Sequence, residues 1–463
     1  MFGKKKEKQG KEKQRKEGYI GAGKFWAWQS REISDAAFTF LMGYVVFYCT
    51  DVLKVNPLTV GTLFAVSKVI DAITDIAAGY IVDNTRTKLG RGRPYDLCLI
   101  GAWVSVVLLF SCPSGFSGGV KIAWVVFWYV MANAVFYTFL NAGENVFKLR
   151  AFDYPQIVKL TSMGGIATSL LGLLCGIFIP QAIAKAGYDP ASWTMVAVVS
   201  AVVFTVSGLA RFAFVRERDD LVVDAQADNE KLKLKEIFQM LTKNHQWVLY
   251  CTIVLIGTVV SNMGVAVYYF EKVLGNLGIQ SIFAAVSALG VFGLVVLPAL
   301  LRRFRMQQVL MWGQVIAVAS YGICFIFYDN IPILCVMYVI SMMAVVPGTY
   351  AASMITYDNA IYNQYLGMHR MEGTMGSVNG FVKRAGGALG TFLLGVVLTA
   401  IQYDPDAVTL APITFWGLRF AQYGLPVISS ALSAFLWSRY TLEKNLPKMK
   451  EELAAKGIQT EAK

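Results

Sequence analysis

Long apolar segments recur along the whole chain, and they constrain its fold more than any other feature of the sequence. Each is about as long as the roughly 20 residues that an α-helix needs to cross the hydrocarbon core of a bilayer. Charged residues make up only 16 % of the 463 residues and lie in short islands between these segments, whereas a soluble protein carries about 25 %. We therefore predict an all-α integral membrane protein with twelve transmembrane helices, at approximately residues 33–50, 60–82, 97–112, 121–145, 161–184, 193–215, 246–270, 280–300, 309–328, 332–355, 376–402 and 413–438.

The basic residues of the loops predict the orientation. Clusters of arginine and lysine follow the second, fourth, sixth and eighth segments, whereas the alternate loops hold at most an isolated lysine such as Lys54 or Lys272. Because cytoplasmic loops carry the excess of basic residues, we place both termini in the cytoplasm of a multi-pass protein of the bacterial cell membrane. This topology also accounts for the formal net charge of +12, so we do not expect a nucleic-acid partner.

A polar stretch at residues 216–245 divides the chain into two halves. We expect a basic cytoplasmic tail at 1–32, a six-helix bundle at 33–215, a central cytoplasmic loop at 216–245, a second six-helix bundle at 246–438 and a cytoplasmic tail at 439–463. A basic loop follows the second segment of each half, NTRTKLGRGRP in the first and LRRFRM in the second. This weak internal symmetry is typical of duplicated transporter halves.

The second segment carries charged residues where a membrane helix rarely has them. Lys68, Asp71 and Asp75 are spaced by three and four residues and share one helix face. A carboxylate at bilayer depth costs roughly 2.5–3.5 kcal/mol, and two carboxylates one turn apart also repel each other. A small cation between Asp71 and Asp75 would offset both terms. The alternative is a buried ion pair with Lys68 that only joins helices.

Enzymatic and transition-metal chemistry are not expected. The seven cysteines fall in or beside apolar segments with no close pair, so they indicate small buried side chains rather than disulfides or a metal cluster. Only two histidines are present, and no pair of nucleophile and base lies at bilayer depth. We expect no cofactor and no obligate protein partner.

The stretch DAITDIAAGYIVDNTRTKLGRGRP resembles the second-helix signature of the glycoside–pentoside–hexuronide cation symporters, the melibiose permease family of the major facilitator superfamily. Thr50-Asp51 with VGTLF, and HRMEG ending at Gly373, are also similar to that family. The resemblance covers the whole chain and implies the major facilitator fold of two six-helix bundles. It also implies alternating-access symport of a sugar-like solute with sodium, a proton or lithium.

The resemblance further implies residue roles. The cation site comprises Asp71, Asp75, Thr74 and Thr138. The solute site comprises Asp35, Asn141, Asn145 and Lys383. From the residues themselves we also expect a coupling or charge network of Lys68, Glu144 and Arg384, in which Glu144 has no counterpart in the family, and a cytoplasmic gate loop of Asp83, Arg86, Arg91 and Arg93.

This chain departs from the family at the solute site. Asn141 stands where melibiose permease has a second sugar-binding aspartate, Asn145 where a tryptophan stacks on the sugar, and Ser162 where an arginine binds it. A simple galactoside is therefore not expected. A carrier of a non-sugar amphipathic or anionic metabolite stays open, and so, more remotely, does a non-transporting membrane sensor.

Two residues also keep a structural alternative. Asp35 could be a helix N-cap near the membrane interface. Glu144 could form an ion pair with Lys148, which lies one helical turn further along the chain.

Overall fold

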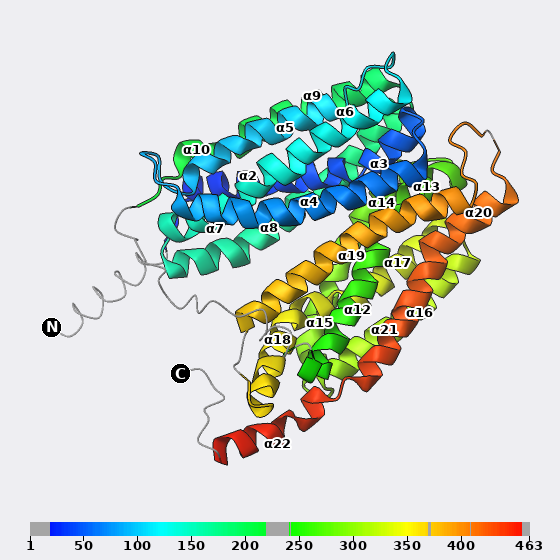
Figure 1. Ribbon diagram of the computed structural model, residues 1–463. Helices are drawn as coiled ribbons and strands as arrows, with labels where there is room; N and C mark the ends of the chain where they lie inside the picture. Colours follow the sequence, from blue (N-terminus) through cyan, green and yellow to red (C-terminus); the bar gives the residue numbers. More distant parts are fainter. Residues whose placement is uncertain (1–18, 219–239, 241, 369–371, 408, 456–463) are drawn as a thin grey trace, which may run out of the picture. The chain divides into compact units, whose positions relative to one another are not determined.

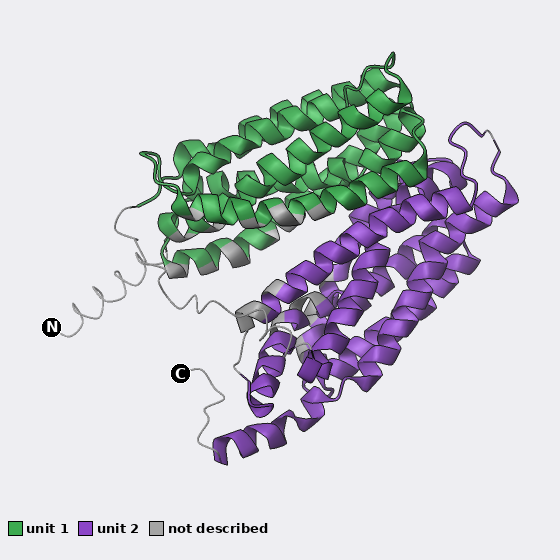
Figure 2. Ribbon diagram, viewed as in Figure 1, with its two compact units in different colours: residues 1–225 green, residues 226–463 purple. Residues whose placement is uncertain are grey.

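The computed structural model describes residues 19–218, 240, 242–368, 372–407 and 409–455 (Figure 1). Within these residues every named element is helical, and the one β-bridge joins Thr87 to Gly90. The chain forms two compact units, Met1–Ala225 and Gln226–Lys463 (Figure 2). Each unit contains six membrane spans and is described by itself.

The spans of unit 1 are built from twelve helical segments. Their bounds, in span order, are α2 (Ala22–Met42), α3 (Val45–Phe47) and the π-helix η1 (Tyr48–Val52); α4 (Pro57–Asn84); the 3₁₀-helix η2 (Arg93–Leu97) and α5 (Cys98–Leu109); α6 (Gly118–Val130), the π-helix η3 (Met131–Tyr137) and α7 (Thr138–Ala151); α8 (Tyr154–Ala186); and α9 (Pro190–Gly208) with α10 (Ala210–Phe214). Helix α2 packs against α8, α9 and α10, and α4 packs against η3 and α7.

Unit 2 repeats the six-span plan and adds a terminal helix. Its bounds are α12 (His245–Ser261), α13 (Val265–Tyr268) and the π-helix η5 (Tyr269–Val273); α14 (Ile279–Ser287), η6 (Ala288–Val291) and α15 (Phe292–Leu301); α16 (Met306–Ile326); α17 (Ile331–Val345) and α18 (Pro347–Tyr365); α19 (Glu372–Ala400); α20 (Pro412–Arg419), η7 (Phe420–Gly424) and α21 (Leu425–Arg439); and α22 (Leu442–Ala455). Helix α16 packs against α17 and α21, and α12 packs against α19.

Capping residues explain where several helices begin. The Asn56 side chain accepts hydrogen bonds from the backbone amides of Leu58 and Thr59, and Pro57 takes the first helical position. Asp189 caps α9 in the same way, ahead of Pro190. Hydrogen bonds from Ser192 hold the pKa of the exposed Asp189 carboxyl below its usual range. Such caps satisfy amides that have no partner inside the helix.

The first span of each unit has the same construction. A break at Gly43 or Gly264 is followed by a short α-helix and then by a π-helix. Tyr48 and Tyr269, the first residues of these π-helices, are both fully buried. The Tyr48 hydroxyl donates to the Phe110 carbonyl at the end of α5, 3.2 Å away, and the Tyr269 hydroxyl donates to the Tyr328 carbonyl just beyond α16. This correspondence extends the internal symmetry far beyond the two basic loops.

Three boundaries expected from the sequence are wrong. The first helix begins at Ala22 rather than near 33. Arg31, which was expected in an exposed tail, is a buried residue of this helix. The tenth span continues from α17 through α18 to Tyr365 rather than ending near 355. The segment after 438 is not only a tail, since it forms α22, which packs on α18 through Leu442, Leu446 and Leu453. Hydropathy misses such segments because their apolar side chains are interspersed with charged ones.

Length and composition independently support a membrane protein. In the described part of the chain, seven helical runs are long and apolar enough to cross a bilayer. All seven cysteines are free and buried or half-buried, which confirms the interpretation of these residues as small apolar side chains.

Candidate cation and solute sites

The charged face of α4 is where the sequence predicts it. The ammonium Nζ of Lys68 lies 3.5 Å from Oδ2 of Asp71, one turn away on the same helix, and 5.9 Å from the centre of the Tyr129 ring. The ion pair is made within α4, and Lys68 also reaches a ring of α6, so the interpretation of this pair as a structural contact between helices stays open. Asp75 is half-buried one further turn along α4.

The two hydroxyl groups of the expected cation site come from α4 and α7. The Thr74 hydroxyl donates to the backbone carbonyls of Ile70 and Asp71, 3.1 and 3.0 Å away. Thr138 is buried at the start of α7 and donates to the carbonyl of Asn133, 3.1 Å away. The π-helix η3 ends immediately before Thr138, and π-helical turns are frequent at functional sites. Each hydroxyl uses its proton inside the helix and keeps lone pairs that can bind a cation.

Asp35 lies in the middle of α2, so it is not an N-cap; Gly21 holds that position. Its Oδ1 atom accepts a hydrogen bond from Nη1 of Arg31 at 2.8 Å and another from the Tyr137 hydroxyl. The Asp35 side chain is 29 % exposed. Asn141, one turn beyond Tyr137 on α7, is exposed. The structure therefore brings Asp35 and the start of α7 together.

The structure describes only some of the remaining residues predicted for the solute site, the charge network and the gate loop. The side chains of Asn145, Ser162 and Asp83 lie outside the described residues. Lys383 and Arg384 are both exposed on α19 of unit 2.

A buried charge network surrounds Glu144. This carboxylate lies 3.2 Å from Lys148, the ion pair expected from their spacing, and 3.3 Å from Arg211. Arg211 is fully buried, and its guanidinium binds both carboxylate oxygens of Asp96 and lies 4.6 Å from the centre of the Trp28 ring. Arg211 and Asp96 were missed at the sequence level. The available signal was an arginine inside the sixth apolar segment and an aspartate at the start of the third.

The expected gate loop is held by a glutamate that the sequence did not single out. The backbone amides of Arg91, Gly92 and Arg93 donate to the Glu217 carboxylate at 2.9, 2.8 and 2.8 Å. Nε of Arg150 donates to the same carboxylate at 3.1 Å. Three converging backbone amides form an anion-binding nest.

The side chains of the gate loop differ in their contacts. The Arg93 guanidinium donates to the carbonyl of Phe212 in α10, at 3.1 and 2.8 Å. Arg86 is exposed. Arg93 therefore ties the loop to the sixth span of its own unit.

Unit 2 contains an equivalent contact. The Glu443 carboxylate, just after the sixth span of that unit, accepts hydrogen bonds from the backbone amides of Met306 and Gln307 at 2.9 Å each. In both units, a glutamate after the sixth span thus binds backbone amides at the end of the basic loop that follows the second span.

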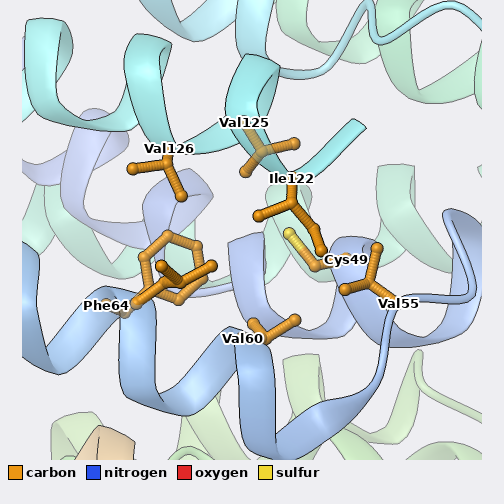
Figure 3. A pocket seen from close by; sticks show the side chains of 8 residues that line it. Cys49, Val55, Val60, Phe64, Ile122, Val125 and Val126 are labelled. Atoms are coloured by element: carbon orange, nitrogen blue, oxygen red, sulfur yellow. The ribbon is translucent and has the colours of Figure 1, made fainter. Parts of the chain in front are cut away.

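A separate pocket between η1, α4 and α6 has an apolar lining (Figure 3). It is formed by Cys49, Val55, Val60, Leu63, Phe64, Ile122, Val125 and Val126. A polyol needs several hydrogen-bonding groups, which these side chains do not offer, so this pocket is not a candidate solute site.

Comparison with known proteins decides the family. The family model of MFS/sugar transport proteins matches residues 32–444. The chain belongs to this family. It is a multi-pass membrane transporter rather than an enzyme.

Similar proteins agree with this assignment. The isoprimeverose transporter of Lactiplantibacillus pentosus is 24 % identical over 94 % of this chain and 92 % of its own length. The glucuronide carrier protein homologue of Escherichia coli K12 is also 24 % identical, over 82 % of this chain and 84 % of its own. A bacterial homologue of the human lysosomal transporter Spinster, solved in an inward-facing unoccupied conformation, superposes with a TM-score of 0.68 at 15 % identity, covering 93 % of this chain and 99 % of that one. The last match shows a shared fold only.

Proposed function

We propose that this MFS transporter is a symporter that couples a monovalent cation, sodium, lithium or a proton, to uptake of a hydroxylated solute of the glycoside or pentoside class. It acts in the cell membrane with both termini in the cytoplasm. The observation that carries the proposal is the pair of carboxylates, Asp71 and Asp75, on a spanning helix that packs against the helix bearing Thr138. The similarity to an isoprimeverose transporter and to a glucuronide carrier supports the solute class.

The chemistry of the α4 face favours a small hard cation. Carboxylate and hydroxyl oxygens are the ligands that such cations prefer, and Lys68 compensates one of the two carboxylates. A cation bound between Asp71 and Asp75 reduces their mutual repulsion and raises the affinity for the solute. By linkage, the solute raises the affinity for the cation by the same factor. Inward movement of one charge contributes roughly 2.3 kcal/mol per 100 mV of membrane potential.

An anionic solute is the second candidate. Lys383 and Arg384 are exposed on α19, and two cations are unusual in a membrane-spanning helix. If they contact the solute, replacing both with glutamine abolishes uptake of an anionic glycoside such as a methyl glucuronide and spares uptake of a neutral methyl glycoside.

Calorimetry of sodium binding to the purified protein at neutral pH, without solute, tests the cation site. We expect saturable binding that is lost in Asp71→Asn and in Asp75→Asn. Asp189→Asn is the matched control, because Asp189 is an exposed helix cap and asparagine caps equally well. Sodium binding that survives both α4 substitutions would refute the assignment.

Absence of sodium binding in the wild type would move the proposal to proton coupling. The measurement is then solute uptake into proteoliposomes under an imposed pH gradient, with the same three variants. An uptake that ignores both the sodium and the pH gradient would refute symport altogether.

A further inference from the structure

Asp35 has one occupied and one available oxygen. Arg31 and Tyr137 both donate to Oδ1, and no described residue donates to Oδ2. A carboxylate has about four lone-pair positions, two on each oxygen. The two protein donors therefore fill Oδ1, whereas Oδ2 can accept up to two further hydrogen bonds. With 29 % of the side chain exposed, Asp35 can be reached from outside the bundle.

Arg31 is too deeply buried to be reached in the same way. Its side chain is 1 % exposed, and its Nε and Nη2 atoms have no hydrogen-bond partner among the described residues. A buried guanidinium is strongly destabilising without a counter-charge. Asp35 supplies that charge one helical turn away, so the pair holds the carboxylate in a single orientation.

Tyr137 is also held rigidly. Its ring stacks on Phe38 with centroids 4.6 Å apart and planes 9° from parallel. Phe38 in turn packs edge-on against Trp103, whose indole donates to the Ser34 hydroxyl at 3.0 Å. Neither donor to Oδ1 can therefore rotate away freely, and Oδ2 is presented at a defined position.

We propose that Arg31 and Tyr137 are positioning residues of the solute site, which saturate Oδ1 of Asp35 and leave Oδ2 to bind one or two hydroxyl groups of the solute. The inference rests on the proposed function and deepens it. At this contact the solute offers hydrogen-bond donors from a neutral polyol, since an anionic group would face the carboxylate of Asp35 while the guanidinium of Arg31 is covered. Two adjacent hydroxyls of a pyranose ring match the two remaining lone pairs.

The experiment combines deoxygenation of the solute with removal of the Tyr137 hydroxyl. The probes are methyl xyloside, methyl glucoside, methyl galactoside and their monodeoxy derivatives, with affinities measured by calorimetry in saturating sodium. In the wild type, loss of the hydroxyl that binds Asp35 should weaken binding about 10- to 100-fold, as for a hydrogen bond to a charged group. In Tyr137→Phe we expect weaker binding of the parent glycoside, and a penalty for the same deoxygenation that falls below about 3-fold.

Control variants separate positioning from general damage. Sodium affinity without solute should be unchanged in Tyr137→Phe. Tyr188→Phe, which removes an exposed hydroxyl from the same unit, should leave every deoxygenation penalty unchanged. Arg31→Gln alone leaves Asp35 without its ion-pair partner, so it is compared with Arg31→Gln/Asp35→Asn, in which both charges are removed together. We expect the double variant to fold, to bind sodium and to lose the deoxygenation penalty.

The outcomes distinguish this inference from the proposed function. A wild type that binds none of the glycosides overturns the solute class and the role of Asp35 together. A wild type that binds them, with a deoxygenation penalty that is the same in Tyr137→Phe, overturns the positioning role alone and leaves glycoside transport standing. A double variant that keeps the deoxygenation penalty overturns the contact between Asp35 and the solute hydroxyl, and with it the positioning role.

Discussion

The Asp96→Asn substitution probes the most deeply buried ion pair of unit 1. Asparagine has the size of aspartate, so the change removes the charge and leaves the packing. The guanidinium of Arg211, 0 % exposed, then loses its main counter-charge. Removal of one partner from a buried pair destabilises a protein by about 3–5 kcal/mol. Glu144 remains 3.3 Å from Arg211, which places the expected loss at the lower limit, about 3 kcal/mol.

Thermal unfolding followed with a thiol-reactive dye measures this loss, because the seven free cysteines are buried or half-buried in the folded protein. For a unit of about 200 residues, a loss of about 3 kcal/mol lowers the apparent Tm by about 6–12 °C. Asp153→Asn is the matched control. Its partner Arg218 lies 3.4 Å away, both side chains are more than a third exposed, and such surface pairs contribute about 0–1 kcal/mol.

Two results would refute this reasoning. One is an Asp96→Asn protein that melts within about 4 °C of the wild type, which is the range expected for the control. The other is a double variant, Asp96→Asn with Arg211→Met, that melts no higher than the single variant. An uncompensated charge is relieved when the arginine is removed too, whereas lost packing is not.

Three further predictions concern unit 1. Glu217→Ala removes the acceptor for three backbone amides of the gate loop, so trypsin should cleave that loop at least about 10-fold faster in native protein, and an unchanged rate would contradict the contact. Gly92→Ala would place a Cβ 2.4 Å from the carbonyl of Gly143, so its yield of folded protein should fall sharply on size exclusion, whereas Gly115→Ala, which meets nothing within 4 Å, should match the wild type. Tyr48→Phe removes one buried hydrogen bond worth about 1 kcal/mol, so the apparent Tm should fall by about 2–4 °C, and an unshifted melt would argue against the bond to the end of α5.

Much of the fold could be predicted from sequence, because membrane insertion selects on length and hydropathy, which are local properties. The twelve apolar segments and the fold class came from that signal. The prediction of helix bounds failed where a charged side chain is buried inside the bundle. Arg31 interrupts hydropathy near the start of α2, although it is buried against Asp35. Only the three-dimensional structure shows that such a residue belongs inside.

The residues of the candidate site were likewise predictable only where the signal is local in the sequence. Asp71 and Asp75 were identified from an unusual charge spacing on a single helix, which a sequence displays directly. The hydrogen bond of Tyr137 to Asp35 and the ion pair of Arg211 with Asp96 join residues that are far apart in the chain. A single sequence contains no signal for such distances.

The contact between Glu217 and the gate loop has a consequence for how that loop can be altered. Its carboxylate binds backbone N–H groups, which every amino acid except proline possesses. The side chain at position 91 can therefore be exchanged for a fluorophore or a cross-linker while the grip of Glu217 on the loop persists. Proline at the same position would remove one of the three backbone donors to Glu217. The main chain of the loop thus makes the contact with Glu217, and the side chain at position 91 is open to labelling.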